Sequence, residues 1–402
     1  MRVAIIGGGA AGFFAALSVR EHHPAAVVTL YEKSDKLLSK VRISGGGRCN
    51  VTHHCLEPRK LAKNYPRGEQ FLRKAFDRFA VRQTIAWFLD HGVELKTETD
   101  GRMFPVTDSS ATIIDALQGT AQRMGIRIAL QSGVKAIEPN GDGAFLLRMG
   151  TEDLLADRVI ITTGGHPNPT SYKWLADLGH TIVAPVPSLF TFNMPGEVIR
   201  ELMGVVVPAR VRITGSDVEC TGPVLITHWG LSGPAVLRAS AFGARSLHDL
   251  DYRFNAQVNW LEGASEETVR QTFAEQADLL DRKLVENANY FRLPKRFWAY
   301  LLHKAGVPSE KHWGAIGKKE RNRLIDLLTN DRYAVAGKTT FKEEFVTAGG
   351  IALEEVDPLT MQSRKVPGVH FAGEVLDIDG VTGGFNFQAA WTTGFLAGKL
   401  DG

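Results

Sequence analysis

The chain has 402 residues, of which 44% are hydrophobic and 23% are charged, and its net charge is +3. This length exceeds one typical hydrophobic core, so we expect two or three domains, and the balanced charge argues neither for nor against an anionic partner. Three cysteines are too few for a secreted disulfide framework and no apolar run reaches membrane-spanning length, so we expect a cytoplasmic protein that contacts no membrane.

The chain opens with a strand, a helix and a second strand. Residues 2–6 form a short, β-branched apolar run without polar alternation, which is typical of a buried parallel strand. After a cluster of glycines, the alanine-rich stretch from Ala10 to Val19 predicts a helix. Val27 to Tyr31 predicts the second strand, which ends at Glu32. This order is a βαβ unit.

Helices and short strands continue up to about residue 162. Apolar residues at helical spacing predict helices over 70–91 and 109–124. Four strand-like segments follow, at 126–131, 133–138, 144–149 and 157–162.

The pattern changes near Pro185 and Pro187. Residues 188–258 are typical of short strands broken by Gly and Pro, with one helix after Gly233. Residues 262–330 are almost wholly helical. Strand character then returns at 333–347. A last strand at 369–372 precedes a glycine-rich turn and a final helix at 386–399. The first and the last segment both place a glycine turn between a strand and a helix. An insertion that splits one nucleotide-binding domain is therefore the simplest organisation.

The first glycine cluster has the spacing of a dinucleotide-binding turn, Gly7-x-Gly9-x-x-Gly12. Its first glycine permits a tight turn, its second lets the backbone approach a pyrophosphate, and its third allows close helix–strand packing. The helix that follows offers unpaired N–H groups to the phosphates. Glu32 lies twenty residues beyond Gly12, where a carboxylate can accept hydrogen bonds from ribose hydroxyls.

Glycine turns elsewhere favour FAD over NAD. Ser44–Asn50 contains three successive glycines before Arg48, and Thr163–Gly165 closes a predicted strand. Gly373-Glu374 ends the last strand, and Gly383–Asn386 begins the last helix. Turns from four distant places that converge on one ligand imply an extended cofactor.

The chain contains one full GxGxxG motif, so a second domain dedicated to a nicotinamide nucleotide is not expected. NAD(P)H, if it is the reductant, must then dock transiently as the hydride donor. Oxygen as the oxidant is the other possibility left by this pattern.

Four stretches resemble the BaiN/RdsA-like (also called YhiN-like) bacterial NAD(P)/FAD-dependent oxidoreductases. They are Val3–Gly12, Ile43–Asn50, Thr227–Ala235 and Phe371–Gln388, the second with Ser-Gly-Gly-Gly-Arg-Cys-Asn and the third with Thr-His-Trp-Gly-Leu-Ser-Gly-Pro-Ala. The resemblance runs from the first strand to the last helix. It departs from the family pattern at Ser39–Arg42, where the family usually has Gly-Arg-Lys.

The resemblance implies an α/β fold in which a Rossmann-like FAD-binding domain is interrupted by a small β-barrel domain and a helical insert. The expected bounds are 1–187 and 346–402 for the FAD-binding domain, 188–261 and 331–345 for the barrel, and 262–330 for the insert. With the motifs above, it gives these candidate cofactor-binding residues: Gly7, Gly9, Ala10, Ala11, Gly12, Glu32, Lys33, Ser44, Gly45, Gly46, Gly47, Arg48, Asn50, Val134, Thr163, Gly164, Gly165, Gly373, Glu374, Gly384, Asn386, Gln388 and Ala389.

Cys49 and His228 are the candidate catalytic residues. Cys49 should lie near the flavin if the glycine triplet does, but its spacing to Cys55 differs from that of disulfide reductases, which favours a packed thiol. His228 stands in a Gly/Ser/Pro-rich turn and could donate a proton to a carbanion or enolate, or could only hydrogen-bond its own loop. The adjacent His53, His54 and Cys55 have no second cluster to complete a tetrahedral set, so no metal is expected.

Charge is concentrated in the predicted helical insert. From Arg282 to Arg323 there are eleven Lys or Arg residues against three Asp or Glu, a net +8, which leaves −5 for the rest of the chain. Aromatic residues are interleaved with these charges. Such a segment could hold RNA phosphates and stack bases, or could be a solvated face over an aromatic core.

Three functions are compatible with these features. The resemblance implies an NAD(P)H-driven reductase of a carbon–carbon double bond activated by a carbonyl, with either uridine in ribosomal RNA or a small enone as the substrate. An oxygen-dependent oxidase of a small amine, of the aminoacetone kind, is the second. A non-enzymatic RNA-binding protein that retains FAD as a structural ligand is the third.

Overall fold

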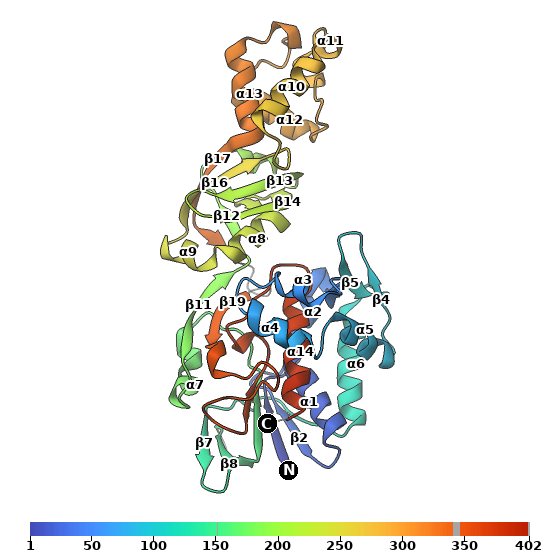
Figure 1. Ribbon diagram of the computed structural model, residues 1–402, viewed down its shortest axis with the longest axis vertical. Helices are drawn as coiled ribbons and strands as arrows, with labels where there is room; N and C mark the ends of the chain where they lie inside the picture. The colour runs from blue at the N-terminus through green and yellow to red at the C-terminus, as the bar shows by residue number, and fades with distance from the viewer. Residues whose placement is uncertain (151, 341–345, 401–402) are drawn as a thin grey trace. The chain divides into compact units, whose positions relative to one another are not determined.

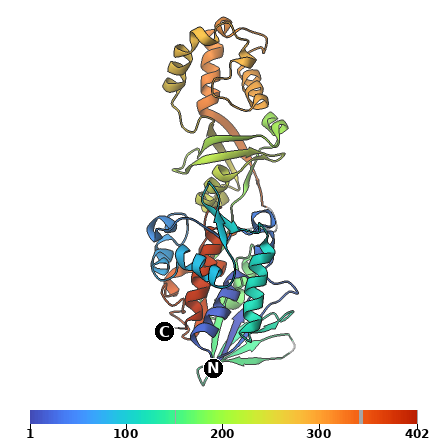
Figure 2. The same cartoon turned by 90° about the vertical axis from the view of Figure 1, so that its right-hand side faces the viewer.

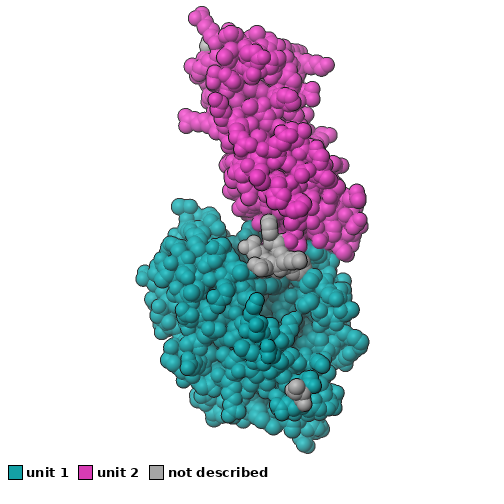
Figure 3. All heavy atoms as spheres, turned by 180° about the vertical axis from the view of Figure 1, so that it is seen from behind, with its two compact units in different colours: residues 1–188, 342–402 teal, residues 189–341 magenta. Residues whose placement is uncertain are grey.

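The chain folds into two compact units, residues 1–188 with 342–402 and residues 189–341 (Figures 1 and 3). The computed structural model describes residues 1–150, 152–340 and 346–400. We call the two parts unit 1 and unit 2. The boundary between the two units therefore falls close to Pro185 and Pro187, where the sequence pattern changes.

Unit 1 is built on a five-stranded sheet in the order β20-β10-β1-β2-β6, in which every neighbouring pair is parallel. Its strands are β1 (Arg2–Ile6), β2 (Val27–Tyr31), β6 (Arg127–Ala129), β10 (Arg158–Ile161) and β20 (Val369–Phe371). Strand β1 is central and buried from its second residue onward, as its unbroken apolar run predicts. Its last residue, Ile6, pairs with both Tyr31 and Ile161, so three strands end together at one edge of the sheet.

Two helices from opposite ends of the chain lie side by side on unit 1, α1 (Ala10–His22) and α14 (Phe385–Gly398) (Figure 1). Glycines make this close contact possible. A Cβ at Gly394 would lie 2.6 Å from the Ala11 carbonyl oxygen, and one at Gly398 would overlap the Ala15 carbonyl oxygen. The final segment therefore belongs to the same domain as the opening one, which confirms the Rossmann-type arrangement.

Smaller elements surround this sheet. The other helices of unit 1 are α2 (Ser39–Gly47), α3 (Pro58–Ala62), α4 (Glu69–Phe76), α5 (Val81–Asp90), α6 (Ser110–Arg123) and α7 (Lys173–Asp177). Three small sheets are formed by β3 (Thr52–His53), β5 (Arg102–Pro105) and β4 (Leu95–Thr97), by β7 (Ala136–Asn140), β8 (Ala144–Arg148) and β9 (Leu154–Ala156), and by β11 (Ile182–Ser188) with β19 (Val346–Ile351).

Unit 2 combines a seven-stranded antiparallel sheet with helices. The sheet order is β17-β16-β13-β14-β15-β12-β18. Its elements in chain order are β12 (Thr191–Asn193), β13 (Val206–Ile213), β14 (Glu219–Ile226), β15 (Gly230–Ser232), α8 (Pro234–Phe242), α9 (Ala244–Asp249), β16 (Arg253–Asn259), α10 (Glu266–Glu275), α11 (Ala277–Leu280), α12 (Lys295–Ala305), α13 (Lys318–Asn330), β17 (Asp331–Ala336) and β18 (Lys338–Thr339). The helices of residues 266–330, yellow to orange, gather at one end of these strands (Figure 2).

One hydrophobic core runs through unit 2, from Phe190 on the strand side to Trp298, Trp313 and Leu324 among the helices. Of the aromatic residues between the basic charges, Phe297, Trp298 and Trp313 therefore belong to the core, and Phe291 and Tyr300 pack against it. The division of this unit into a barrel domain and a separate helical domain stays a prediction.

The predicted elements agree with the structure where the apolar pattern is long. Residues 70–91 form two helices, α4 and α5, with a break at residues 77–80, and the strand expected at 133–138 begins only at Ala136. The strand character expected at 333–347 divides into β17, β18 and β19, and its part at 341–345 lies outside the described residues. Strands of two to four residues, such as β3 and β5, carry too little pattern to be recognised.

Candidate active site

The turn between β1 and α1 requires two of its glycines for its own packing. Gly7 has φ of +116°, and a Cβ there would lie 2.5 Å from the Thr162 carbonyl oxygen at the end of β10. A Cβ at Gly12 would overlap the Gly7 carbonyl oxygen and lie 2.8 Å from the Thr162 hydroxyl oxygen. These glycines let the turn and helix α1 approach β10 closely, as the motif predicts.

Gly9 has no such reason to be glycine. Its φ of −90° suits any residue, and a Cβ there would meet no atom within 4 Å. It caps α1 without a side-chain hydrogen bond, and the first intrahelical bond runs from the Phe13 N–H to the Gly9 carbonyl (3.1 Å). The N–H groups of Ala10, Ala11 and Gly12 precede this first bond, so they have no acceptor within the helix. They lie where helix N-termini bind anions. The missing side chain at Gly9 leaves room for such an anion.

Glu32 is held beside this turn. One carboxylate oxygen accepts a hydrogen bond from the Gly8 N–H (2.8 Å), and the other accepts from the N–H and the hydroxyl of Ser34 (both 2.9 Å). The Ser132 N–H donates to the Glu32 carbonyl (2.8 Å), so the loop that contains Val134 lies alongside, with the exposed Lys33 near Gly133. The structure thus brings Glu32, Lys33 and the Val134 loop together.

The glycine triplet at the C-terminal end of α2 forms a left-handed turn. Gly45, Gly46 and Gly47 have φ of 59°, 69° and 86°, and a Cβ at Gly46 or Gly47 would meet nothing within 4 Å. Only glycine adopts three such conformations in a row without strain, and the open space lies on the exposed side of the turn. Backbone N–H groups in a turn of this kind are available to a ligand.

Arg48 fixes this turn. Its guanidinium pairs with Glu98 (2.7 Å) and lies over the Phe104 ring, 4.0 Å from the centroid. The hydrogen bond and charge of Glu98 raise the pKa of Arg48 above its ordinary value. A cofactor contact of Arg48 stays a prediction, and the guanidinium has structural partners already.

The last helix starts against the same region. Gly384 caps α14 with φ of +90°, and a Cβ there would lie 2.5 Å from the Thr52 carbonyl oxygen. The Asn50 amide, oriented to satisfy its neighbours, accepts from the Gly384 N–H and donates to the Thr52 carbonyl, both at 3.0 Å. Asn50 therefore joins the glycine-triplet loop to the N-terminus of α14.

The remaining two corners meet as well. A Cβ at Gly373 would lie 2.8 Å from the Ala11 Cβ, and one at Gly165 would lie 2.5 Å from a Glu374 carboxylate oxygen. Glu374 also accepts from the Thr347 N–H (2.8 Å) and pairs with Lys40 (2.7 Å) at the start of α2. The separated glycine turns of the sequence thus come together in unit 1, which is the arrangement that an extended dinucleotide requires.

Three residues of α14 have established structural roles. The Asn386 side chain accepts from the Gly380 N–H (2.8 Å) and donates to the Gly380 carbonyl (2.9 Å). Gln388 is fully buried and bonds the hydroxyls of Thr52 (2.6 Å), Thr84 (2.9 Å) and Thr392 (3.0 Å), and Ala389 is buried as well. These side chains position the helix, and their expected contacts with the cofactor stay predictions.

Cys49 has the properties of a packed thiol. It is fully buried, and burial raises the pKa of its thiol to about 12. Cys55, half-buried, and Cys220, buried, are also free cysteines. Since the thiolate is the reactive form, a neutral Cys49 is a poor redox nucleophile.

We therefore expect only the Cys55 thiol to react in the native protein, and to react slowly, because partial burial raises the pKa of this thiol as well. The substitution Cys49→Ala should leave FAD content and turnover unchanged, because the raised pKa keeps the thiol protonated at every pH below about 12. Thiol titration before and after unfolding measures the first point. A variant that keeps its flavin but loses turnover would instead establish a redox role for Cys49.

His228 belongs to unit 2, in the loop between β14 and β15. It is exposed, its carbonyl accepts a hydrogen bond from Arg200 (2.7 Å), and its ring lies 4.6 Å from that of Trp229. No hydrogen bond to its ring occurs in the part of the chain that the structure describes. Its role as a proton donor stays a prediction.

Two kinds of feature are absent from the described residues. Within the described ranges, no three His, Cys, Asp or Glu side chains are grouped so that they could hold a metal ion. Likewise, no described helix combines the length and apolarity needed to cross a bilayer.

Sequence reasoning missed two parts of the site. Lys40 lies where the sequence departs from the family pattern, and it pairs with Glu374. Arg67, in the loop before α4, pairs with the buried Asp379 in the loop before α14, and the Ser188 hydroxyl donates to the same carboxylate (2.7 Å). Partners more than three hundred residues apart leave no local signal in one sequence.

Comparisons with known proteins agree with this fold. Residues 1–400 match the family described as HI0933-like protein Rossmann domain. A ribosomal RNA dihydrouridine synthase of Escherichia coli is 30% identical over 404 residues, which cover 98% of this chain and 96% of that protein. A 3-dehydro-bile acid delta(4,6)-reductase of Clostridium scindens is 28% identical over 407 residues, which cover 99% and 98%.

A solved structure shares the fold at low identity. The 3-ketosteroid-delta4-(5alpha)-dehydrogenase of Rhodococcus jostii, in complex with 4-androstene-3,17-dione, is 13% identical, with a TM-score of 0.52 and coverage of 100% of this chain and 96% of that one. The glycine corners of unit 1 fit FAD, because they bring two helix N-termini and the Glu32 carboxylate, which is expected to bind a ribose, around open backbone. The chain belongs to the HI0933-like Rossmann-domain family and is an FAD-dependent oxidoreductase.

Proposed function

We propose that this protein uses NADH or NADPH to reduce a carbon–carbon double bond conjugated to a carbonyl, in uridine of ribosomal RNA or in a small enone. One observation carries the proposal: two relatives that align with nearly the whole chain are named for different substrates with the same bond type. A 3-dehydro-delta(4,6) bile acid has a carbonyl conjugated to ring double bonds. Uracil likewise conjugates its ring double bond to a carbonyl.

The residues of unit 1 would hold the cofactor. Bound FAD would supply hydride transfer to the carbon β to the carbonyl. The open N-terminus of α1 and Gly9 would receive the pyrophosphate, and Glu32 would accept hydrogen bonds from the ribose. The α-carbon takes a proton, from water or from a side chain, for which His228 is our candidate. Because one dinucleotide fingerprint exists, NAD(P)H would bind only transiently.

The basic segment 282–323 supports RNA as the substrate over a small enone. Its net +8 contrasts with −5 for the rest of the chain, so it would attract a polyanion. A small-molecule reductase has no need of such a segment.

Anaerobic mixing of the purified protein with candidate reductants tests the proposal. We expect NADPH or NADH to bleach the flavin rapidly, and an enone or unmodified ribosomal RNA to restore its colour. Bleaching by a small amine instead would support the oxidase, and inertness to all three would leave a non-enzymatic RNA-binding protein. In the same assay, a proton-donor role for His228 predicts that His228→Gln slows only the reoxidation step.

Dihydrouridine in ribosomal RNA separates the two substrates. Cells that lack the gene should lose this modified base at one site and regain it when the gene is restored. Unchanged ribosomal RNA, together with reoxidation by enones, would assign the small-molecule reaction.

A further inference from the structure

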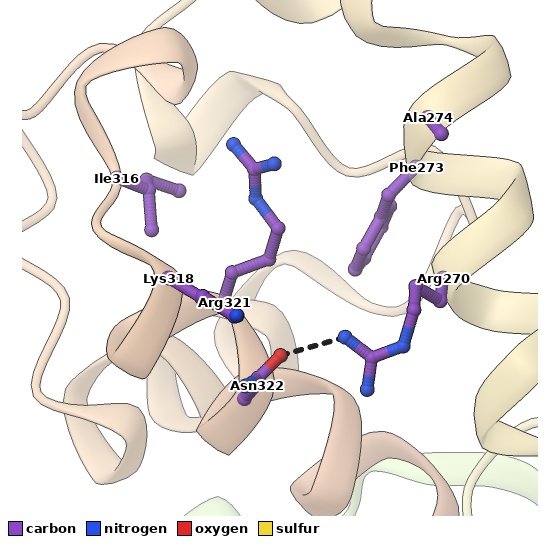
Figure 4. A pocket seen from close by; sticks show the side chains of 7 residues that line it. All are labelled: Arg270, Phe273, Ala274, Ile316, Lys318, Arg321 and Asn322. Carbon is purple, nitrogen blue, oxygen red and sulfur yellow. Dashed lines mark hydrogen bonds between the residues drawn. The ribbon is translucent and has the colours of Figure 1, made fainter.

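A hollow of about 360 Å³ lies in unit 2 between helices α10 and α13 (Figure 4). Its volume is within the range of ligand-binding pockets. Arg270 and Phe273 line it from α10, Ile316 lines it from the preceding loop, and Lys318 and Arg321 line it from α13. Three cations thus share one small concave surface.

None of these three cations has a carboxylate partner among the described residues. Arg270 donates instead to the neutral side-chain oxygen of Asn322 (2.7 Å), shown as the dashed line in Figure 4. Glu320, on the same helix as Arg321, is committed elsewhere: it pairs with Lys311 (2.7 Å) and accepts from the Gly317 N–H (2.7 Å). The positive charge of the hollow is therefore not compensated by its surroundings.

Arg321 enters the hollow with an unsatisfied donor. Figure 4 shows its side chain extending between Ile316 and Phe273. Its Nε is buried and has no hydrogen-bond partner among the residues that the structure describes. A buried guanidinium N–H without an acceptor is unfavourable, and an anionic oxygen would satisfy it.

Three other cations of the basic segment are already engaged. Lys304 pairs with the buried Asp331 (2.6 Å), Lys311 pairs with Glu320, and Arg296 donates to the Glu201 carbonyl (2.9 Å). The net charge of the segment therefore overstates what an incoming polyanion can contact. The cations around the hollow remain available.

We propose that the hollow between α10 and α13 binds a phosphodiester group of the RNA substrate. The planar fork of an arginine matches phosphate oxygens, and two arginines with a lysine can surround one phosphate. The excess positive charge of segment 282–323 favours an extended polyanion over an isolated phosphate. This assignment rests on the proposed function, in which RNA is the substrate.

Binding of a ribosomal RNA fragment to the full-length flavoprotein over a range of salt concentrations tests this assignment. We expect the triple variant Arg270→Gln, Lys318→Gln, Arg321→Gln to bind about tenfold or more weakly, because charge-assisted hydrogen bonds to phosphate are lost. The slope of log affinity against log salt should fall by roughly 0.7 to 0.9 for each phosphate contact removed. The double variant Arg270→Gln, Lys318→Gln keeps the half-buried Arg321. Weaker binding by this variant therefore cannot be caused by misfolding after the loss of Arg321.

A matched control removes the same charge from the same segment. Lys295, Lys319 and Arg323 are exposed and do not line the hollow, so their triple replacement by Gln should weaken binding less and uniformly. Equal losses in control and hollow variants would overturn the assignment. Wild-type protein without RNA affinity would also overturn it, whereas NAD(P)H-driven enone reduction in that protein would leave the reductase standing.

Discussion

Replacing Gly9 with serine is expected to weaken FAD binding on the order of a hundredfold, about 2.7 kcal/mol, without destabilising the apoprotein. A Cβ at Gly9 meets nothing within 4 Å, and φ of −90° suits serine. Serine is also a better N-cap than glycine, by a few tenths of a kcal/mol. The added side chain would instead occupy the space through which a pyrophosphate approaches the α1 N-terminus. Thermal unfolding of apoprotein and FAD titration measure the two effects separately.

Gly317→Ser is the matched control for this change. Gly317 caps α13 with φ of −68°, and a Cβ there would meet only the Glu320 carboxylate, at 3.4 Å. The same substitution should therefore be tolerated and leave FAD affinity unchanged. If Gly9→Ser also left FAD affinity unchanged, the pyrophosphate would not lie at this helix N-terminus.

Removing Arg67 is expected to have the largest effect on stability. Asp379 is fully buried, and Arg67 binds both of its carboxylate oxygens. Arg67→Ala would leave a buried carboxylate with only the Ser188 hydroxyl, which costs about 3–5 kcal/mol of the free energy of unfolding. Urea denaturation at a fixed FAD concentration measures the loss.

The double variant Arg67→Leu, Asp379→Leu separates the contribution of the two charges from the contribution of side-chain packing. Replacing both charges by apolar groups removes the desolvation cost along with the attraction, so we expect a much smaller loss than in Arg67→Ala. Losses of equal size would show that packing, and not the buried charge, holds this loop before α14.

Much of unit 1 could be predicted because its signals are local. A short apolar run predicts the buried strand β1, and the glycine spacing predicts the turn at Gly7. The carboxylate of Glu32 stands at a fixed distance from that turn along the chain, so the sequence displays all three features directly. The chemistry of an extended dinucleotide predicts that distant glycine turns lie around one ligand. The contacts of Gly373 with Ala11 and of Gly165 with Glu374 agree with this prediction.

The rest depends on contacts that a single sequence does not display. The sequence names Arg48 as a cofactor-binding candidate but does not display its contacts with Glu98 and Phe104. It likewise names Gln388 but does not display the three threonine hydroxyls around that side chain. Both cofactor contacts stay predictions. The charge of segment 282–323 could be counted, but which cations stay uncommitted could not, because the partner of Lys304 is a buried aspartate on β17.

The flavin content of the purified protein tests the central claim most directly. The account predicts a yellow protein that releases one FAD per chain when it is denatured, with Gly9→Ser giving a folded but colourless protein. A colourless wild-type protein that stays so when FAD is added would contradict it.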